Sequence, residues 1–373
     1  MKSDQKFCLV SSNYPPDIGG PSKFASTFPF TLQEHSGTVV TTTSGESDTL
    51  KFSNHSVIRV SRNIHIIHRT IKVVCAIWKT ARIKSTEVIA NGFFIETFLA
   101  CLLARRSYVA KLAGDIVWEK AKNANLTNLS IVEFQKANLQ IKLRIFRAVN
   151  SLSIRSARKV ICPTMELAHL AELWGVDVKK IVVIPNSVDS GRFSPEKNIA
   201  KDIDVICVNR LVEWKGLHEV IQACSKLNLK ITIAGTGPMY EDLQKQALSL
   251  KAHVTFLGDV SNEDLIGYLN RSSIYILNST YEATAYSLLE AMSCGLVSIA
   301  RIGTGSEDVI DQNINGLLVG GIDYPHVLDA LIAIKDNHKM SAAVGIFARE
   351  KITKEFDISI NYSRISKILF HES

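Results

Sequence analysis

The chain has 373 residues, of which 46% are hydrophobic and 21% are charged. This length exceeds what one hydrophobic core usually supports and suits two domains. The sequence has no run of eighteen apolar residues, and residues 1–6 are polar, so we expect neither a transmembrane helix nor a secretory signal. The seven cysteines are scattered without a C-x-x-C pair, which favours a reducing cytoplasm over a disulfide framework or a zinc site.

The net charge of +7 is unevenly distributed. Residues 61–86 and 136–159 contain no acid and are predicted to be helical, with Leu139, Leu143, Phe146 and Val149 as a core-facing stripe in the second segment. Two interpretations remain open: a solvated basic face, or a surface for anionic lipid or an acidic acceptor at the inner side of a membrane. The cations of the two segments are Arg62, Arg69, Lys72, Lys79, Arg82, Lys84, and Lys136, Lys142, Arg144, Arg147, Arg155, Arg158, Lys159.

Short segments rich in β-branched residues alternate with helical patterns in the first half of the chain. A turn-rich loop over residues 13–20 follows the first strand, and Pro21 suits the first turn of a helix. Strands that alternate with helices predict a parallel sheet covered on both faces. We assign this first domain to residues 1–187, with strands at 7–11, 38–43, 57–60, 87–90, 108–112, 159–162 and 181–184.

A turn-rich linker at residues 185–195 precedes a second series of the same kind, over residues 188–356. The predicted class is therefore α/β, with two Rossmann-like domains facing a central cleft and ligands at the carboxyl ends of the strands. Residues 357–373 are expected to form a last helix that packs back on the first domain. The second series has strands at 204–208, 230–234, 254–257 and 274–277, and helices from about 216, after Pro238, at 262–271 and at 286–293.

Two carboxylates, Glu282 and Glu290, flank a segment that follows the strand at 274–277 and opens a helix. Carboxylates accept hydrogen bonds from vicinal sugar hydroxyls, and the start of a helix attracts phosphate. A sugar–diphosphate–ribose ligand would use the whole segment, including Thr284, Ala285, Tyr286, Ser287 and Leu288. The alternative is that Glu290 only favours the start of the helix and that Glu282 is an ordinary loop acid.

Arg210 and Lys215 follow the strand at 204–208 and lead into a helix. Two cations at this position suit a diphosphate, because Arg offers a planar fork and Lys a point charge. Gly235 and Gly237 form a second turn between a strand and a helix, and Gly19 with Gly20 form a third. These glycines either allow a ligand to approach the backbone or simply make tight turns.

Taken in order, these motifs resemble the large retaining glycosyltransferase family of the family 4 type, which has the GT-B architecture and includes enzymes of polysaccharide and lipid-linked glycan assembly. The resemblance covers nearly the whole chain through Y-P-P-x-x-G-G, R-L-V-x-x-K-G, A-G-x-G-P, F-L-G and E-x7-E. It implies that Arg210 and Lys215 bind the diphosphate, Glu282 the donor sugar and Glu290 the ribose. It also places Gly20 near the phosphate or sugar, and the turn from Gly258 to Val260 near the base.

The chain departs from the family pattern at Ala283-Thr284-Ala285, where the family usually has Gly-Phe-Gly or Gly-Phe-Pro. It also lacks the usual Pro after Gly295. The segment from Lys111 to Glu119 resembles a subset of polysaccharide-building members, and Asp115 is then a candidate for contact with the acceptor or the transferred sugar. Trp118 and Glu119 are equally candidates for packing and capping a helix.

The resemblance implies transfer of a sugar from a nucleotide diphosphate-sugar to a glycan acceptor, lipid-linked in the interpretation we favour, with retention and without a metal or other cofactor. Asp202 and Asp204 spell a D-x-D, but they lie at the amino end of a strand, away from the expected site. No nucleic-acid partner is expected. A phosphorylase or an epimerase on the same scaffold, and a subunit that binds a sugar nucleotide without turnover, remain as alternatives.

Overall fold

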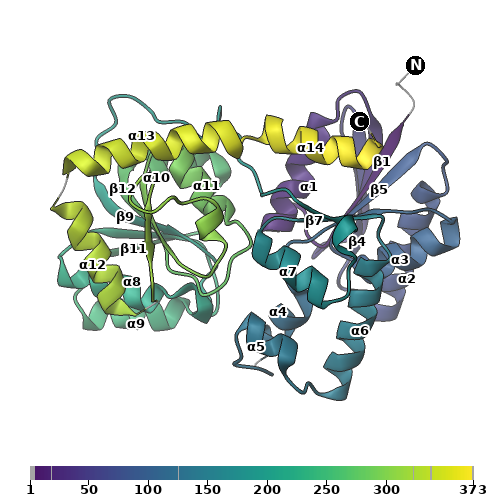
Figure 1. Ribbon diagram of the computed structural model, residues 1–373, viewed down its shortest axis with the longest axis horizontal. Helices are drawn as coiled ribbons and strands as arrows, with labels where there is room; N and C mark the ends of the chain where they lie inside the picture. Colours follow the sequence, from purple (N-terminus) through teal and green to yellow (C-terminus); the bar gives the residue numbers. More distant parts are fainter. Residues whose placement is uncertain (1–4, 18, 125, 322, 337, 372–373) are drawn as a thin grey trace. The chain divides into compact units, whose positions relative to one another are not determined.

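The structure, a computed structural model, describes residues 5–17, 19–124, 126–321, 323–336 and 338–371, without the side chains of 338–342. The chain divides into two compact units, the first comprising Met1–Pro185 with Tyr362–Ser373 and the second Asn186–Asn361. Each unit has its own sheet (Figure 1). Among the described residues, no helix combines the length and the apolar character that crossing a bilayer requires.

The first unit contains a sheet in the order β3-β4-β2-β1-β5-β6-β7-β8. All of its pairs are parallel except β3 with β4. Each of the seven predicted strands is present, whereas β3 was not predicted because its side chains are mostly exposed and show no apolar run. The strands are β1 (Lys6–Ser11), β2 (Ser36–Thr43), β3 (Asp48–Lys51), β4 (His55–Ser61), β5 (Thr86–Asn91), β6 (Val109–Lys111), β7 (Lys159–Cys162) and β8 (Ile181–Val183). The helices are α1 (Gly20–Thr31), α2 (Ile66–Ala81), α3 (Phe94–Ala104), α4 (Ile116–Asn123), α5 (Ile131–Lys136), α6 (Ile141–Arg155) and α7 (Met165–Leu173).

The second unit contains a parallel sheet in the order β11-β10-β9-β12-β13-β14. Helices α8, α9 and α12 cover one face, and α10, α11 and α13 cover the other (Figure 1). The strands are β9 (Ile203–Val208), β10 (Ile231–Ala234), β11 (Val254–Gly258), β12 (Ser272–Leu277), β13 (Val297–Arg301) and β14 (Leu317–Val319). The helices are α8 (Leu217–Lys226), α9 (Tyr240–Ser249), α10 (Asn262–Arg271), α11 (Tyr286–Ser293), α12 (Tyr324–Lys335) and α13 (His338–Glu355).

The last helix, α14 (Ile358–Phe370), contacts the first unit from Tyr362 onward. The Tyr362 ring packs edge-on against Phe24 and Phe28 of α1, with ring centroids 5.5 and 5.3 Å apart. Its hydroxyl forms a 2.7 Å hydrogen bond with Thr27. These contacts pack the side chain of Tyr362 against α1.

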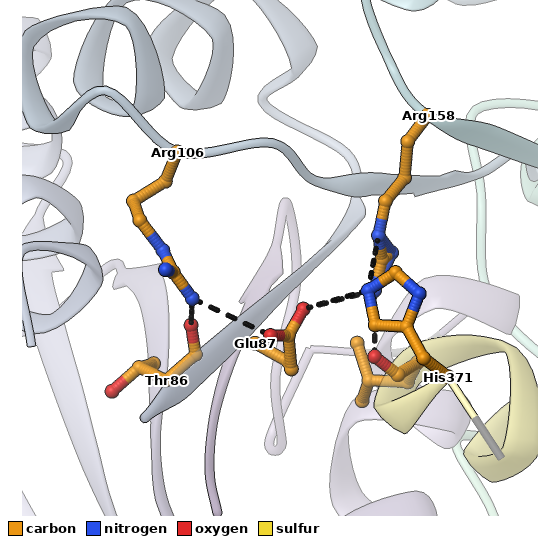
Figure 2. A network of polar contacts seen from close by, with 6 residues as sticks. Thr86, Glu87, Arg106, Arg158 and His371 are labelled. Atoms are coloured by element: carbon orange, nitrogen blue, oxygen red, sulfur yellow. Dashed lines mark hydrogen bonds and ion pairs between the residues drawn. The ribbon is translucent and has the colours of Figure 1, made fainter. Parts of the chain in front are cut away.

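An ion-pair network fixes the end of α14 (Figure 2). Glu87, in β5, accepts from Arg158 at 2.9 Å and from Arg106 at 3.4 Å. Arg158 also donates to the carbonyl oxygen of Leu369 at 2.6 Å and to the ring of His371 at 3.2 Å. Arg158 and Glu87 are largely shielded from solvent, so this network holds α14 more firmly than a surface ion pair would.

The core-facing stripe predicted for α6 is wrong at two of its four positions. It begins at Ile141, so Leu139 precedes it, and Val149 is 39% exposed instead of buried. The buried residues of α6 are Asn150, Ser153 and Ile154, near its C-terminal end. Two of these three are polar, so the face that packs inward does not stand out in the hydrophobic pattern.

Candidate active site

Lys215 lies in the loop that joins β9 to α8. The loop contains a 3₁₀ turn, Glu213–Lys215, and ends at Gly216 with a left-handed φ of 58°. A Cβ at Gly216 would lie 2.5 Å from the carbonyl oxygen of Asn278, which directly follows β12. The Asn278 amide in turn donates to the carbonyl oxygen of Gly216 at 3.0 Å. Only glycine therefore fits here, and the end of β12 fixes the turn that carries Lys215.

The structure brings Lys215 together with Glu282, although 67 positions separate them in sequence. Their side chains form an ion pair and are only 15% and 13% exposed. Ser279 donates to the same carboxylate oxygen of Glu282 at 2.7 Å, and the backbone N–H of Thr280 donates to the carbonyl oxygen of Trp214 at 2.9 Å. Because the pair is largely shielded from water, its attraction exceeds that of an exposed ion pair.

Arg210 lies in the same loop, with an exposed side chain. Its backbone is fixed on both sides, since the N–H of Asn209 donates to the carbonyl oxygen of Ala234 at 3.0 Å and the N–H of Leu211 to that of Thr236 at 2.9 Å. The ion pairs found among the described residues do not include Arg210. Its guanidinium is thus presented to solvent from a rigid backbone.

Gly235 and Gly237 make the close approach that fixes the Arg210 loop. A Cβ at Gly235 would lie 1.9 Å from the carbonyl oxygen of Asn209, and one at Gly237 would lie 2.3 Å from that of Leu211. Gly235 also has a φ of 131°, and its N–H donates to the carbonyl oxygen of Gly258 at 2.7 Å. Backbone packing therefore accounts for both glycines, and their contact with a ligand stays a prediction.

Asn186 holds the turn that follows Glu282, a role that the sequence analysis missed. Its side-chain amide donates to the carbonyl oxygens of Ala283 and Thr284, both at 3.0 Å. Thr284 is buried in the left-handed region, with φ 50°, which is strained for a β-branched residue. The sequence analysis treated Asn186 only as part of a linker, because the loop it contacts lies 97 positions away.

Helix α11 begins with Tyr286, and Ala285 before it supplies no side-chain cap. The start of this helix therefore offers backbone N–H groups and a partial positive charge to an anion. The side chain of Leu288 is buried in the core, so a ligand reaches this residue only through its backbone. Ser287 forms a 2.7 Å hydrogen bond with the buried Tyr275, and the carboxylate-bearing Glu290 is only 3% exposed. The ribose contact of Glu290 stays a prediction.

The turn expected near the base lies at the end of β11. Val260 packs against the core beside α10, and Asp259 accepts a 3.0 Å hydrogen bond from Thr236. A hollow of about 470 Å³ borders Asp259 and Val260 and extends along α10 to Arg271. Lys215 and Glu282 are not among its lining residues. The hollow therefore does not connect the turn with the ion pair.

In the first unit, Asp115 caps the start of α4. One of its carboxylate oxygens accepts from the N–H groups of Val117 and Trp118 at 2.9 and 3.1 Å, and the other accepts from Gln135 at 2.9 Å. Asp115 is only 2% exposed, and this burial raises the pKa of its carboxyl group. The cap of α4 is thus Asp115, which was not among the residues expected to cap a helix, while Trp118 is buried as a packing residue. A contact of Asp115 with a sugar stays a prediction.

The remaining expected positions lie at the start of α1 and at the amino edge of the second sheet. Gly19 and Gly20 follow β1 and begin α1, with Gly19 at φ 131°. Asp202 pairs with Arg271, and Asp204 accepts a 2.7 Å hydrogen bond from the N–H of Lys230, both at the amino edge of the second sheet. Within the described part of the chain, no three His, Cys, Asp or Glu residues gather in a way that would hold a metal ion.

The second unit carries the family signature. Residues 189–351 match the family model described as glycosyl transferases group 1. Over 392 residues, which cover 100% of both chains, the sequence is 23% identical to a mannosyltransferase of Corynebacterium glutamicum. The chain is a glycosyltransferase whose second unit matches the group 1 family. It is also 26% identical to the putative colanic acid biosynthesis glycosyltransferase WcaL of Escherichia coli, over 54% of this chain and 55% of that protein.

Solved structures of low sequence identity share the fold of this glycosyltransferase. Sucrose-phosphate synthase from Thermosynechococcus elongatus matches with a TM-score of 0.81 at 17% identity, over 99% of this chain and 100% of that one. HepE of Anabaena, solved in complex with UDP-glucose, matches with a TM-score of 0.76 at 17% identity, over 98% and 99% of the two chains. The predicted GT-B fold and the predicted glycosyltransferase class are confirmed.

The close approach at Gly235 is testable by substitution. Gly235→Ala is expected to lower the free energy of unfolding by about 3 kcal/mol, because its Cβ would strike the carbonyl oxygen of Asn209 at a strained φ. Gly258→Ala is the matched control, since its φ of 67° is also left-handed but a Cβ there meets no atom within 4 Å. This control should lose only about 1 kcal/mol. Urea denaturation followed by circular dichroism measures both, and equal losses would contradict the packing role.

Proposed function

We propose that this glycosyltransferase transfers a hexose from a nucleotide diphosphate-sugar to a glycan acceptor, with retention at the anomeric carbon and without a metal ion. The observation that carries the proposal is the shielded ion pair of Lys215 and Glu282, beside the uncapped start of α11. The relatives support the donor class, since the full name of the corynebacterial enzyme includes GDP-mannose and HepE was solved with UDP-glucose.

Lys215 can bind the diphosphate of such a donor while it stays paired with Glu282. Its ammonium has three donors, so it can keep its bond to Glu282 and also donate to a phosphate oxygen. Arg210, exposed on a fixed backbone, adds a planar fork for the same diphosphate. The negative charge of this leaving group grows as the glycosidic bond breaks, so fixed cations stabilise the transition state more than the bound donor. Removal of one such group is expected to raise the barrier by about 3 kcal/mol.

The reaction that we propose needs no protein nucleophile. The acceptor oxygen bonds to the anomeric carbon on the face that the diphosphate leaves, and the bond from that carbon to the phosphate oxygen breaks. The proton of the acceptor hydroxyl passes to the departing phosphate oxygen. Glu282 accepts hydrogen bonds from the donor sugar hydroxyls, and Glu290 from the ribose. In the first unit, Gly20 is proposed to face the phosphate or sugar of the donor, and Asp115 the acceptor or the transferred sugar.

The D-x-D motif has other partners, which supports metal independence. Asp202 is paired with Arg271, and Asp204 accepts from the backbone of Lys230, at the edge opposite the carboxyl ends of the strands. Arg210 and Lys215 supply, at the carboxyl edge, the positive charge for which other transferases use magnesium or manganese.

Donor binding and metal dependence are tested together. In a thermal-shift screen of nucleoside diphosphates and their sugars, one base is expected to raise the melting temperature by mass action. With that donor, sugar transfer in excess EDTA should equal transfer in magnesium. If no nucleotide shifts the melting temperature, the proposed donor class is wrong. If EDTA abolishes transfer and magnesium restores it, the metal-independent mechanism is wrong.

We also propose that the acceptor is lipid-linked and that the first unit contacts an anionic membrane through α2, α3 and α6. Helix α3 packs against both α2 and α6. These helices expose apolar side chains that a fully solvated face would not need: Ile66, Ile67, Ile71, Leu99, Leu102, Leu103, Ile141, Ile145 and Leu152. Their exposed cations include Lys72, Lys79, Lys142 and Arg144. Apolar side chains with surrounding positive charge match the surface of a bilayer that contains anionic lipid.

Vesicle sedimentation tests this surface. The protein is expected to sediment with phosphatidylcholine vesicles that contain phosphatidylglycerol, and to be released by salt. The double variant Ile141→Ser/Ile145→Ser should bind at least about 10-fold more weakly, because each buried Ile contributes about 1.5–3 kcal/mol. Ile346→Ser/Phe347→Ser, which removes two exposed apolar residues of α13, is the control and should bind normally. Unchanged binding of the α6 variant would contradict the proposed surface.

A further inference from the structure

The end of β13 carries a cation, Arg301, that the predicted site does not include. Arg301 is the last residue of the strand and pairs with Val319 of β14. On the other side of β13, Leu277 pairs with Ala300, so the next residue of β12, Asn278, lies beside Arg301. Because the strands are parallel, Arg301 lies at the same edge of the sheet at which β9 and β12 end. The loops that contain Lys215 and Glu282 begin at this edge.

Side-chain alternation shows on which face Arg301 lies. Ile299 belongs to the core cluster shared with α8 and α12, and Ala300 to the cluster on the other face. Arg301 therefore projects on the α8 side of the sheet. The same alternation places Asn278 and Asn209 on that side, after Ile276 and Cys207 of the same cluster. Three polar side chains thus form a row across the ends of β9, β12 and β13.

This row is rich in hydrogen-bond donors. The Nε atom of Arg301 and the Nδ2 atom of Asn209 are buried and have no hydrogen-bond partner among the residues that the structure describes. A buried donor of this kind costs about 1–3 kcal/mol unless an acceptor satisfies it. Helix α8 begins here too, and Gly216 before it supplies no side-chain cap. All three features favour an acceptor, and the guanidinium favours one with negative charge.

The charges of the site indicate which anion this is. Glu282 offsets the charge of Lys215, whereas Arg210 and Arg301 at this edge form no ion pair with any residue that the structure describes. A diphosphate in a nucleotide sugar carries one negative charge on each phosphate, so two further cations complement it. We propose that Arg301 is a third cation of the donor site and binds the diphosphate. This inference rests on the proposed function and adds a phosphate-binding residue to it.

Calorimetry on the full chain tests the role of Arg301. UDP, GDP and ADP are titrated into the parental protein, and the one that binds is then titrated into the variants. Arg301→Gln is expected to weaken this nucleoside diphosphate by about 10-fold or more, as for a lost charged hydrogen bond. Arg301→Lys, which keeps the charge, should lose only about threefold. Binding of the corresponding nucleoside, which has no phosphate, should be unchanged.

Arg271→Gln is the matched control, because Arg271 lies at the opposite end of β12, where it pairs with the exposed Asp202. It should bind the diphosphate like the parental protein. Parental affinity in Arg301→Gln overturns the inference, as does an equal loss in all three variants. If the parental protein binds none of the three nucleotides, the proposed function fails first.

Discussion

The ion pair of Lys215 and Glu282 is the contact on which the candidate site depends. It joins the loop after β9 to the loop after β12, two neighbouring strands of one parallel sheet. Ser279 and the backbone of Trp214 and Thr280 support the same junction. An ammonium and a carboxylate held together in this way suit a ligand that presents phosphate oxygens beside sugar hydroxyls.

The backbone around this pair is fixed by close contacts that tolerate no side chain. Gly216 lies against Asn278, and Gly235 lies against Asn209. Asn186 holds the turn at Thr284 in a conformation that is strained for a β-branched residue. Rigid loops of this kind keep charged groups in place before a ligand binds, so little energy is spent on reorganisation during the reaction. The departure from the Gly-rich family pattern at 283–285 is thus accompanied by a side-chain clamp.

Much of the fold could be predicted from the sequence, because buried parallel strands are short apolar runs between turns. The same argument placed Lys215 and Glu282 at one sheet edge, where their pairing is now seen. It did not find β3, which is exposed, β13, which follows soon after α11, or β14, which has only three residues. It also expected Val149 to be buried, since helical spacing alone does not show which apolar face packs.

The missed site residues share one physical property: their roles arise from contacts between distant segments. Asn186 reads as a linker residue until its amide is seen against a loop 97 positions away. Arg301 stands out only when strand register places it beside Asn278. Neither residue type nor local spacing carries this information. The surface proposed to contact a membrane shows the converse case, since its cations were evident in the sequence while its exposed apolar side chains required the structure.

A double-mutant cycle tests the central claim most directly. Sugar transfer is measured as kcat/KM for the parental protein, Lys215→Met, Glu282→Gln and the double variant. If the two side chains act as one unit on the donor, the effects are non-additive, and the double variant loses little more than the worse single variant. The expected coupling energy is at least about 1 kcal/mol. Additive losses, or single variants that transfer sugar at the parental rate, would contradict the account.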